Sequence, residues 1–295
     1  MTLSVRVTAM LFAGLALGAA PGQAQSVSGA FTMSGKSFKP THAAAFRMRD
    51  QNAPRTFETY VMLTTGPVDV KKISDDVDPY TVAINEPAAM NGDYIGIQIN
   101  DAGETRVNAH IGGTQYIDTS GYLMGMKGSL VATCKENTPG RIACSVKTAQ
   151  PVKPMSGPEW TMDVTFATPV ASRTPGKPLP PDGGPAGKAL LTLITAVGGK
   201  TLAPILAGLT PAQAKSYQES YNTPAENLKS AKEILGIRLP KKPKITGGEI
   251  IADDYLVLEV EGVPFGTSRM LYLIEMRLVD KTWRYDGSSS VGMLP

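Results

Sequence analysis

The chain has 295 residues, a formal net charge of +3 at pH 7, two histidines and two cysteines. So small a charge excludes the dense basic surface with which nucleic-acid-binding proteins hold phosphates. Two histidines exclude histidine-rich metal sites, and the H-E-x-x-H, P-loop, G-x-S-x-G and G-x-G-x-x-G motifs are all absent. We therefore expect neither a bound metal nor a cofactor. The length allows one large domain or two ordinary ones.

The N-terminus has the layout of a secretory signal peptide over residues 1–24. Arg6 provides a positive charge, residues 9–20 are apolar, and small residues precede a cleavage site after Ala24. The apolar stretch is shorter than the roughly 20 residues that span a membrane. We expect a soluble mature chain, periplasmic or secreted by a bacterium, with no stable membrane insertion.

Residues 25–167 are predicted to form an all-β sandwich. Short runs rich in β-branched and aromatic residues alternate with turn signals such as Asn91-Gly92-Asp93 and Pro139-Gly140. The expected strands contain the sequences FTMSG, HAAAFRMR, TFETYVMLT, DYIGIQI, TRVNAHI, GSLVATC, RIACSV and WTMDVTF. Between two of them, DVKKISDDVDPY is expected to be a loop with at most a short helical turn.

Both cysteines lie in one predicted hairpin. Cys134 shares a strand face with Leu130, and Cys144 shares a face with Val146 on the returning strand. Folding at the Pro139-Gly140 turn brings the two sulfurs together on the apolar side. Because reactive pairs usually have C-x-x-C spacing at a helix N-terminus, we expect a structural disulfide rather than a redox site.

Few side chains in this part are candidates for chemistry. By alternation, His110 belongs to the polar face of its strand, and His42 is expected at a strand edge. Asp75, Asp76 and Asp78 form an acidic loop, but it lacks the D-x-D-x-D-G spacing of calcium loops. A solvated loop is the preferred interpretation, with an ion site as the alternative.

Residues 168–187 are predicted to be an interdomain linker. Proline, glycine and polar residues dominate this stretch, and proline at this density favours extended conformations. A second proline-containing segment, RLPKKPK from Arg238 to Lys244, is basic but cannot present a helical face. We expect it to be a solvated connector rather than an anion site.

Residues 188–295 are predicted to have an α+β fold, with helices followed by an antiparallel sheet. Thr210 and Thr223 each precede a proline and are expected to be helix N-caps, and Gly236 is expected to end the second capped helix. Asp280-Lys281 is expected to form a tight turn. The expected strands contain the sequences KITGGEII, DYLVLEVEG, SRMLYLIEMRLV and TWRYDGS.

The capped helices, the strand pair and the closing DKTWRYDG resemble the nuclear-transport-factor-two-like, or SnoaL-like, superfamily of α+β cones. The resemblance covers roughly a third of the chain. It implies a curved sheet around a cavity, and its enzymes place Asp or His acids inside. This half has no histidine, and its aspartates are predicted turn residues: Asp253, Asp254, Asp280 and Asp286. The catalytic part of the resemblance therefore does not carry over. The N-terminal half resembles β-sandwich domains of uncharacterised exported bacterial proteins.

Four aromatic side chains are candidates for lining a ligand pocket in the cone: Tyr217, Tyr255, Tyr272 and Trp283. Each has an apolar body and a polar tip, which suits a pocket for a small ligand. Ordinary core packing is the competing and preferred interpretation.

We expect an exported, non-enzymatic protein that binds a partner protein or a small apolar ligand in the cell envelope. The alternatives are a cone-type isomerase or dehydratase, with an Asp or Tyr as acid or base, and a structural envelope component. The enzyme requires a buried carboxylate that faces a cavity.

Overall fold

A computed structural model describes residues 25–50, 52–86, 92–118, 130–153, 158–219, 223–264 and 268–294. The predicted signal peptide, residues 1–24, lies outside the described residues. We refer to residues 25–171 as the N-terminal region and to residues 172–294 as the C-terminal region. Within the described chain, no helix is long and apolar enough to cross a membrane.

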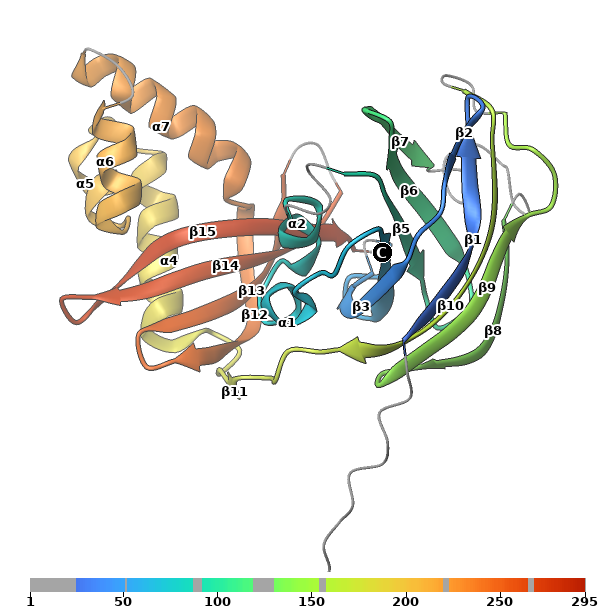
Figure 1. The fold of residues 1–295 in the computed structure, drawn as a ribbon. Helices are drawn as coiled ribbons and strands as arrows, with labels where there is room; N and C mark the ends of the chain where they lie inside the picture. The colour runs from blue at the N-terminus through green and yellow to red at the C-terminus, as the bar shows by residue number, and fades with distance from the viewer. Residues whose placement is uncertain are drawn as a thin grey trace, which may run out of the picture.

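The N-terminal region is one ten-stranded sheet that curls around a core (Figure 1). Its strands are β1 (Ser26–Met33), β2 (Lys36–Phe38), β3 (His42–Arg49), β4 (Phe57–Thr64), β5 (Tyr94–Ile99), β6 (Thr105–Ile111), β7 (Thr114–Asp118), β8 (Leu130–Thr138), β9 (Arg141–Thr148) and β10 (Trp160–Ala171). The predicted strand segments are all present. The sequence predicted two stacked sheets, whereas here β10 joins them. It pairs with β1 and β9, and then through Val170 and Ala171 with β3.

Alternation divides the side chains of this sheet into two buried sets. The concave face carries the main core, in which the Trp160 and Phe31 rings stack at 5.3 Å. The convex face of β3, β4 and β5 packs against two short helices, α1 (Val70–Ser74) and α2 (Pro79–Ile84). The sequence predicted no more than a helical turn here, but Asp69 and Asp78 each accept a hydrogen bond from a backbone amide and cap a helix.

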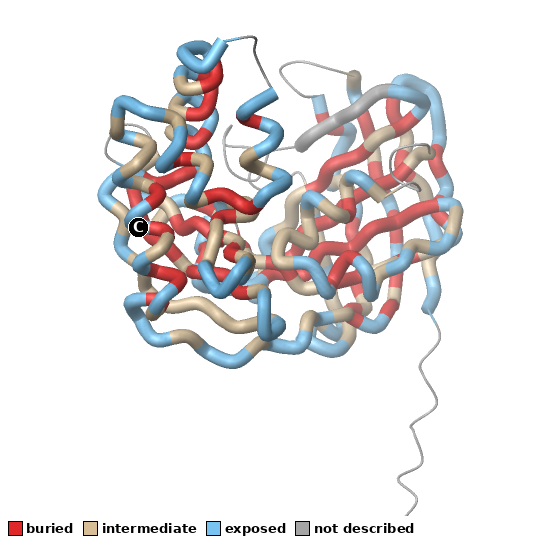
Figure 2. Tube along the Cα trace, turned by 90° about the vertical axis from the view of Figure 1, so that its left-hand side faces the viewer, coloured by how far each residue is buried: buried red, intermediate tan, exposed pale blue. Residues whose placement is uncertain are grey.

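The C-terminal region is a five-stranded antiparallel sheet with helices on one face (Figure 1). Its strands are β11 (Lys177–Pro178), β12 (Lys241–Ala252), β13 (Tyr255–Val263), β14 (Met270–Val279) and β15 (Thr282–Met293). Its helices are α4 (Gly184–Val197), α5 (Ala203–Ala207), α6 (Pro211–Glu219) and α7 (Pro224–Arg238). Buried residues run along the strands under these helices, and exposed residues gather on the outer surfaces of the helices (Figure 2).

Several local predictions are refined by the structure. Asp280 and Lys281 both have positive φ, 50° and 63°, as the predicted tight turn requires. Thr223 caps α7 as expected, but α7 continues past Gly236 to Arg238, so the predicted end was wrong. Tertiary packing against the sheet outweighs the preference of one glycine to end a helix. Thr210 directly precedes α6, and its carbonyl accepts the Ala214 amide at 2.8 Å, while its hydroxyl donates to Asp286 at 2.9 Å.

Parts of the segment predicted as a linker form strands of the two sheets. β10 occupies its first residues up to Ala171, and β11 pairs with β12 through Lys177 and Pro178. α4 then begins at Gly184. Pro178 suits β11, because β11 is an edge strand and needs hydrogen bonds on one side only. The basic connector RLPKKPK likewise contributes the start of β12 from Lys241.

Candidate ligand-binding groove

The four aromatic candidates do not converge on one site. Tyr217 and Tyr272 lie in the core between helices and sheet, and Trp283 packs against that core. Tyr255 is on the opposite face of the sheet, because it alternates with the core residue Leu256. The Tyr272 hydroxyl is buried and has no hydrogen-bond partner within the described residues.

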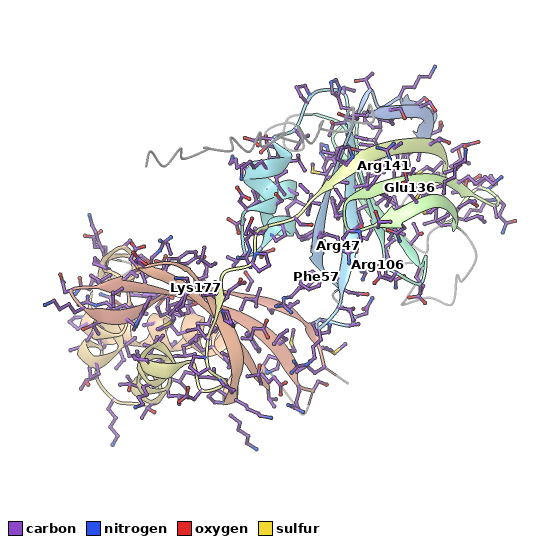
Figure 3. All side chains as sticks on the ribbon, turned by 90° about the horizontal axis from the view of Figure 1, so that it is seen from below. Arg47, Phe57, Arg106, Glu136, Arg141 and Lys177 are labelled. Carbon is purple, nitrogen blue, oxygen red and sulfur yellow. A yellow bond between two sulfur atoms is a disulfide. The ribbon has the colours of Figure 1, made fainter. Side chains whose placement is uncertain are left out.

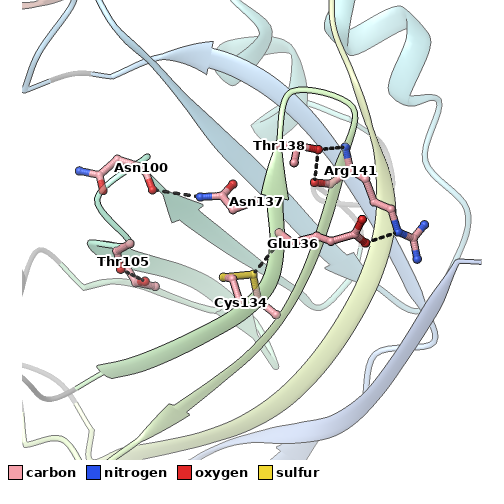
Figure 4. The surroundings of a disulfide bond; sticks show 9 residues. Asn100, Thr105, Cys134, Glu136, Asn137, Thr138 and Arg141 are labelled. Atoms are coloured by element: carbon pink, nitrogen blue, oxygen red, sulfur yellow. Dashed lines mark hydrogen bonds and ion pairs between the residues drawn. A yellow bond between two sulfur atoms is a disulfide. The ribbon is translucent and has the colours of Figure 1, made fainter.

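Cys134 and Cys144 lie opposite each other on β8 and β9, as the predicted hairpin requires (Figure 4). Their sulfurs are 2.06 Å apart. Cys144 belongs to the concave core, and Cys134 packs against it. Beside them, Glu136 pairs with Arg141 across the hairpin. The surroundings are those of a packed crosslink and not of an exposed thiol pair.

The other chemical candidates have local structural partners. Asp75 pairs with Lys71, Asp76 accepts the Asp78 amide at 2.9 Å, and Asp78 caps α2. Nδ1 of His110 lies 3.2 Å from the Gly92 carbonyl oxygen. His42 begins β3, where its Nδ1 lies 2.9 Å from the hydroxyl of Thr41. No cluster of three potential ligands that could hold a metal ion occurs among the described residues.

The two regions enclose a groove formed by two adjoining cavities, of about 370 and 440 Å³. Both cavities share the same floor: Met48, Arg49, Val77, Pro79 and Leu273. Met48 and Arg49 come from β3, Val77 and Pro79 from the α1–α2 segment, and Leu273 from the helix-free face of β14. The site therefore exists only when both regions are together.

Two arginines of the N-terminal region pair with glutamates of the C-terminal sheet. Arg49 pairs with Glu259, and Arg55 pairs with Glu261. Within the C-terminal region, Arg173 pairs with Glu249, which also accepts the Gly176 amide at 2.7 Å. Burial opposes ionisation of Glu249, but its hydrogen bonds from Arg173 and Gly176 outweigh burial and lower its pKa. The regions are thus joined by ion pairs at the groove.

The wall of the first cavity, of about 370 Å³, combines an exposed aromatic ring with cationic groups. Phe57 is 45% exposed, and the Arg49 guanidinium lies 5.3 Å from its ring centroid. In Figure 3, Arg47 and Phe57 lie on the side of the N-terminal region that is turned toward the C-terminal region. Nη1 of Arg173 is buried without a hydrogen-bond partner in the described part of the chain. A buried donor of this kind is costly unless something binds to it.

A polar network covers the helix-free face of β13 and β14. The Tyr255 hydroxyl donates to Glu275 at 2.7 Å, and the Arg277 guanidinium lies 4.0 Å from the Tyr255 ring centroid. Burial raises the pKa of Glu275, and the carboxylates of Asp76 and Asp286 add to that rise. Since Asp76 belongs to the α1–α2 segment, charges of both regions influence this network.

One edge of the groove is formed by the end of β15. Ser288, Ser289, Ser290 and Val291 line the second cavity opposite the start of α2. The Ser289 hydroxyl donates to Asp78 at 2.9 Å and connects the two sides. A backbone edge is therefore available inside the groove, beside apolar side chains.

A second buried charge cluster lies on the convex face of the N-terminal sheet. Arg106 donates to Glu58 at 2.7 Å and lies 3.6 Å from Asp50. Glu58 and Asp50 are only 1% and 5% exposed. Burial raises the pKa of Glu58 to about 7; Asp50 adds to this and Arg106 opposes it.

The sequence matches no protein-family model and no curated protein. Sequence reasoning missed the groove, although one signal was present. In DYLVLEVEG, Glu259 and Glu261 alternate with core residues and so mark a charged sheet face. Nothing local connects that face with Arg49 or Arg55, more than 200 residues earlier.

Proposed function

We propose that the protein is an exported, non-enzymatic binding protein that holds its ligand in the groove between its two regions. One observation carries the proposal: two adjoining cavities share a floor built from both regions. Ligand sites occur preferentially where two structural units meet. The apolar floor would bury a ligand, while Arg173 and the ion pairs supply a few directional polar groups.

A binding function suits the placement of charges better than the cone-type enzyme does. The helix-facing positions of β13 and β14 carry aliphatic side chains, methionine and Tyr272 in the described residues. The carboxylates of Glu249, Glu259 and Glu275 project from the other face, toward the groove. The relation to the α+β cones remains a proposal, supported by helices that precede an antiparallel sheet.

Export is part of the same proposal. It is supported by the disulfide between Cys134 and Cys144, because disulfides persist in oxidising compartments. The N-terminal sequence pattern of residues 1–24 points the same way. We further propose that the two regions are separate folding units that meet at the groove, since none of the three apolar clusters contains residues of both.

Native mass spectrometry of gently purified protein tests the proposal. We expect a reproducible non-covalent adduct that Val77→Trp removes, because Val77 lies on the floor shared by both cavities. Val131→Trp is the matched control, since Val131 is 39% exposed on β8 and lines neither cavity. An adduct that survives Val77→Trp would place binding elsewhere, and a bare mass in every preparation would contradict a binding function.

A further inference from the structure

The free edge of β15 distinguishes this groove from a simple apolar cleft. Tyr285 lies opposite Met276 on β14, and its backbone turns away from β14: its amide donates to Gly208 and its carbonyl accepts from Thr210, both at 2.9 Å. Antiparallel ladders alternate, so residues opposite Ile274 and Tyr272 also turn their backbone outward. These residues are Ser288 and Ser290.

The outward backbone of Ser288 and Ser290 has no strand beside it in the described chain. On that side, β15 forms only the isolated bridge between Leu209 and Tyr285. The second cavity runs beside this unpaired stretch. Unpaired strand backbone is a template for another extended chain.

β11, β2 and β8 carry the usual protection of a free edge, whereas the outer edge of β15 is interrupted only by the register shifts at Asp286 and Val291, which flank Ser288 to Ser290. β11 has two residues, including a proline, and β2 has three, including Lys36. β8 is interrupted by a bulge and carries Lys135 and Glu136. By contrast, Gly287 to Met293 reads GSSSVGM, without a charge or a proline. Because natural proteins usually place charges or prolines on free edges, a stretch of free edge without either inside a groove indicates a use for it.

We propose that the ligand of the groove is an extended peptide segment that pairs with the outer edge of β15 from Ser288 onward. Backbone hydrogen bonds to Ser288 and Ser290 provide affinity that does not depend on the peptide's sequence. Alternate side chains of the peptide point into the second cavity, where Met48, Leu273 and Tyr80 favour apolar residues. The inference rests on the proposed function and names the class of ligand.

The side chains around the edge agree with a peptide rather than a strongly charged ligand. Asp78 and Arg49 give the second cavity one charge of each sign. The three serine side chains are small: the Ser288 hydroxyl donates to the Arg238 carbonyl, the Ser289 hydroxyl donates to Asp78, and Ser290 is exposed. A peptide backbone can therefore approach β15 closely without meeting a bulky side chain.

The test uses the full chain and a library of random dodecapeptides displayed on phage. Selected peptides are synthesised and titrated against the wild type, Ser290→Pro and Ser290→Ala by calorimetry. Proline removes the outward amide of residue 290 without removing a bond to β14, whereas alanine removes only the hydroxyl. We expect at least about tenfold weaker binding for Ser290→Pro and a change within about twofold for Ser290→Ala.

A second measurement keeps the inference testable if Ser290→Pro does not fold. Hydrogen exchange on the wild type should slow at the Ser288 and Ser290 amides when the peptide is added. Equal affinity of the two variants, unprotected amides, or a failure to select any peptide overturns the inference. If the Val77→Trp-sensitive adduct persists in that case, the groove binds another class of ligand and only the peptide inference has failed.

Discussion

Side chains alternate between two faces along the strands of both regions, but the two regions use the second sheet face differently. In the N-terminal sheet, strands β3 to β5 have both faces buried under apolar contacts, one by the curl and one by α1 and α2. In the C-terminal sheet the helix face holds the core, whereas the other face combines the apolar side chains of Val257, Leu271 and Leu273 with the carboxylates of Glu249, Glu259 and Glu275. A face that is not used for the core is free to form a site, and the groove lies on that face.

The largest expected effect tests whether the two cores are independent. Trp160→Ala should cost about 3–5 kcal/mol, because Trp160 is 1% exposed in the concave core. Leu258→Ala, in the core under the helices, should cost about 2–5 kcal/mol. Hydrogen exchange should show each loss confined to its own region. Equal destabilisation of both regions by either change would mean that they unfold as one unit.

The next prediction concerns Glu58 in the N-terminal sheet. Its folded pKa of about 7 lies above the ordinary value of 4.5, so the protonated carboxyl stabilises the fold. That stability is complete below about pH 4.5 and is lost as pH rises toward about 7, a change of about 3 kcal/mol.

Denaturant unfolding at pH 5 and pH 8 measures this loss. In Glu58→Gln the side chain stays neutral, so the free energy of unfolding of the N-terminal region should no longer fall by that amount between the two pH values. Hydrogen exchange in the C-terminal region should be unchanged. A parallel pH profile of wild type and variant would contradict the assignment.

Removal of the disulfide should have a somewhat smaller effect, again on one region. The bond joins residues separated by 10 positions, so the loop-entropy model gives about 2.5–3 kcal/mol. Chemical denaturation of the Cys134→Ala/Cys144→Ala variant measures the loss, with reduced wild type as the control. A loss that appears in the C-terminal region instead would refute the independence of the two cores.

The smallest effect on stability is expected at the ion pairs across the groove. Arg49 and Glu259 are partly exposed, so their pair should contribute at most about 1 kcal/mol. Arg49→Glu should nevertheless increase the radius of gyration in small-angle scattering, and adding Glu259→Arg should reverse the increase. High salt should also increase the radius of gyration, because it screens the ion pairs. An unchanged radius in all three cases would show that the ion pairs do not hold the regions together.

The strands and the disulfide were predictable because their signals are local. The alternation around Cys134 and Cys144 fixed both the facing positions and the apolar side of the hairpin. The end of α7 was not predictable from Gly236, because packing of the later residues decides whether the helix continues. Tyr217 and Tyr255 looked alike in sequence, yet opposite faces of one sheet separate them.

By itself, the sequence determined which segments are strands or helices, where the crosslink forms and which side of each strand is apolar. These properties depend on periods of two and 3.6 residues and on short turns. Only the tertiary structure decided that β10 closes one curled sheet and that Arg49 meets Glu259. It also placed the free edge of β15 beside α2. Such contacts join residues far apart in the chain, and many partners would satisfy the same local pattern.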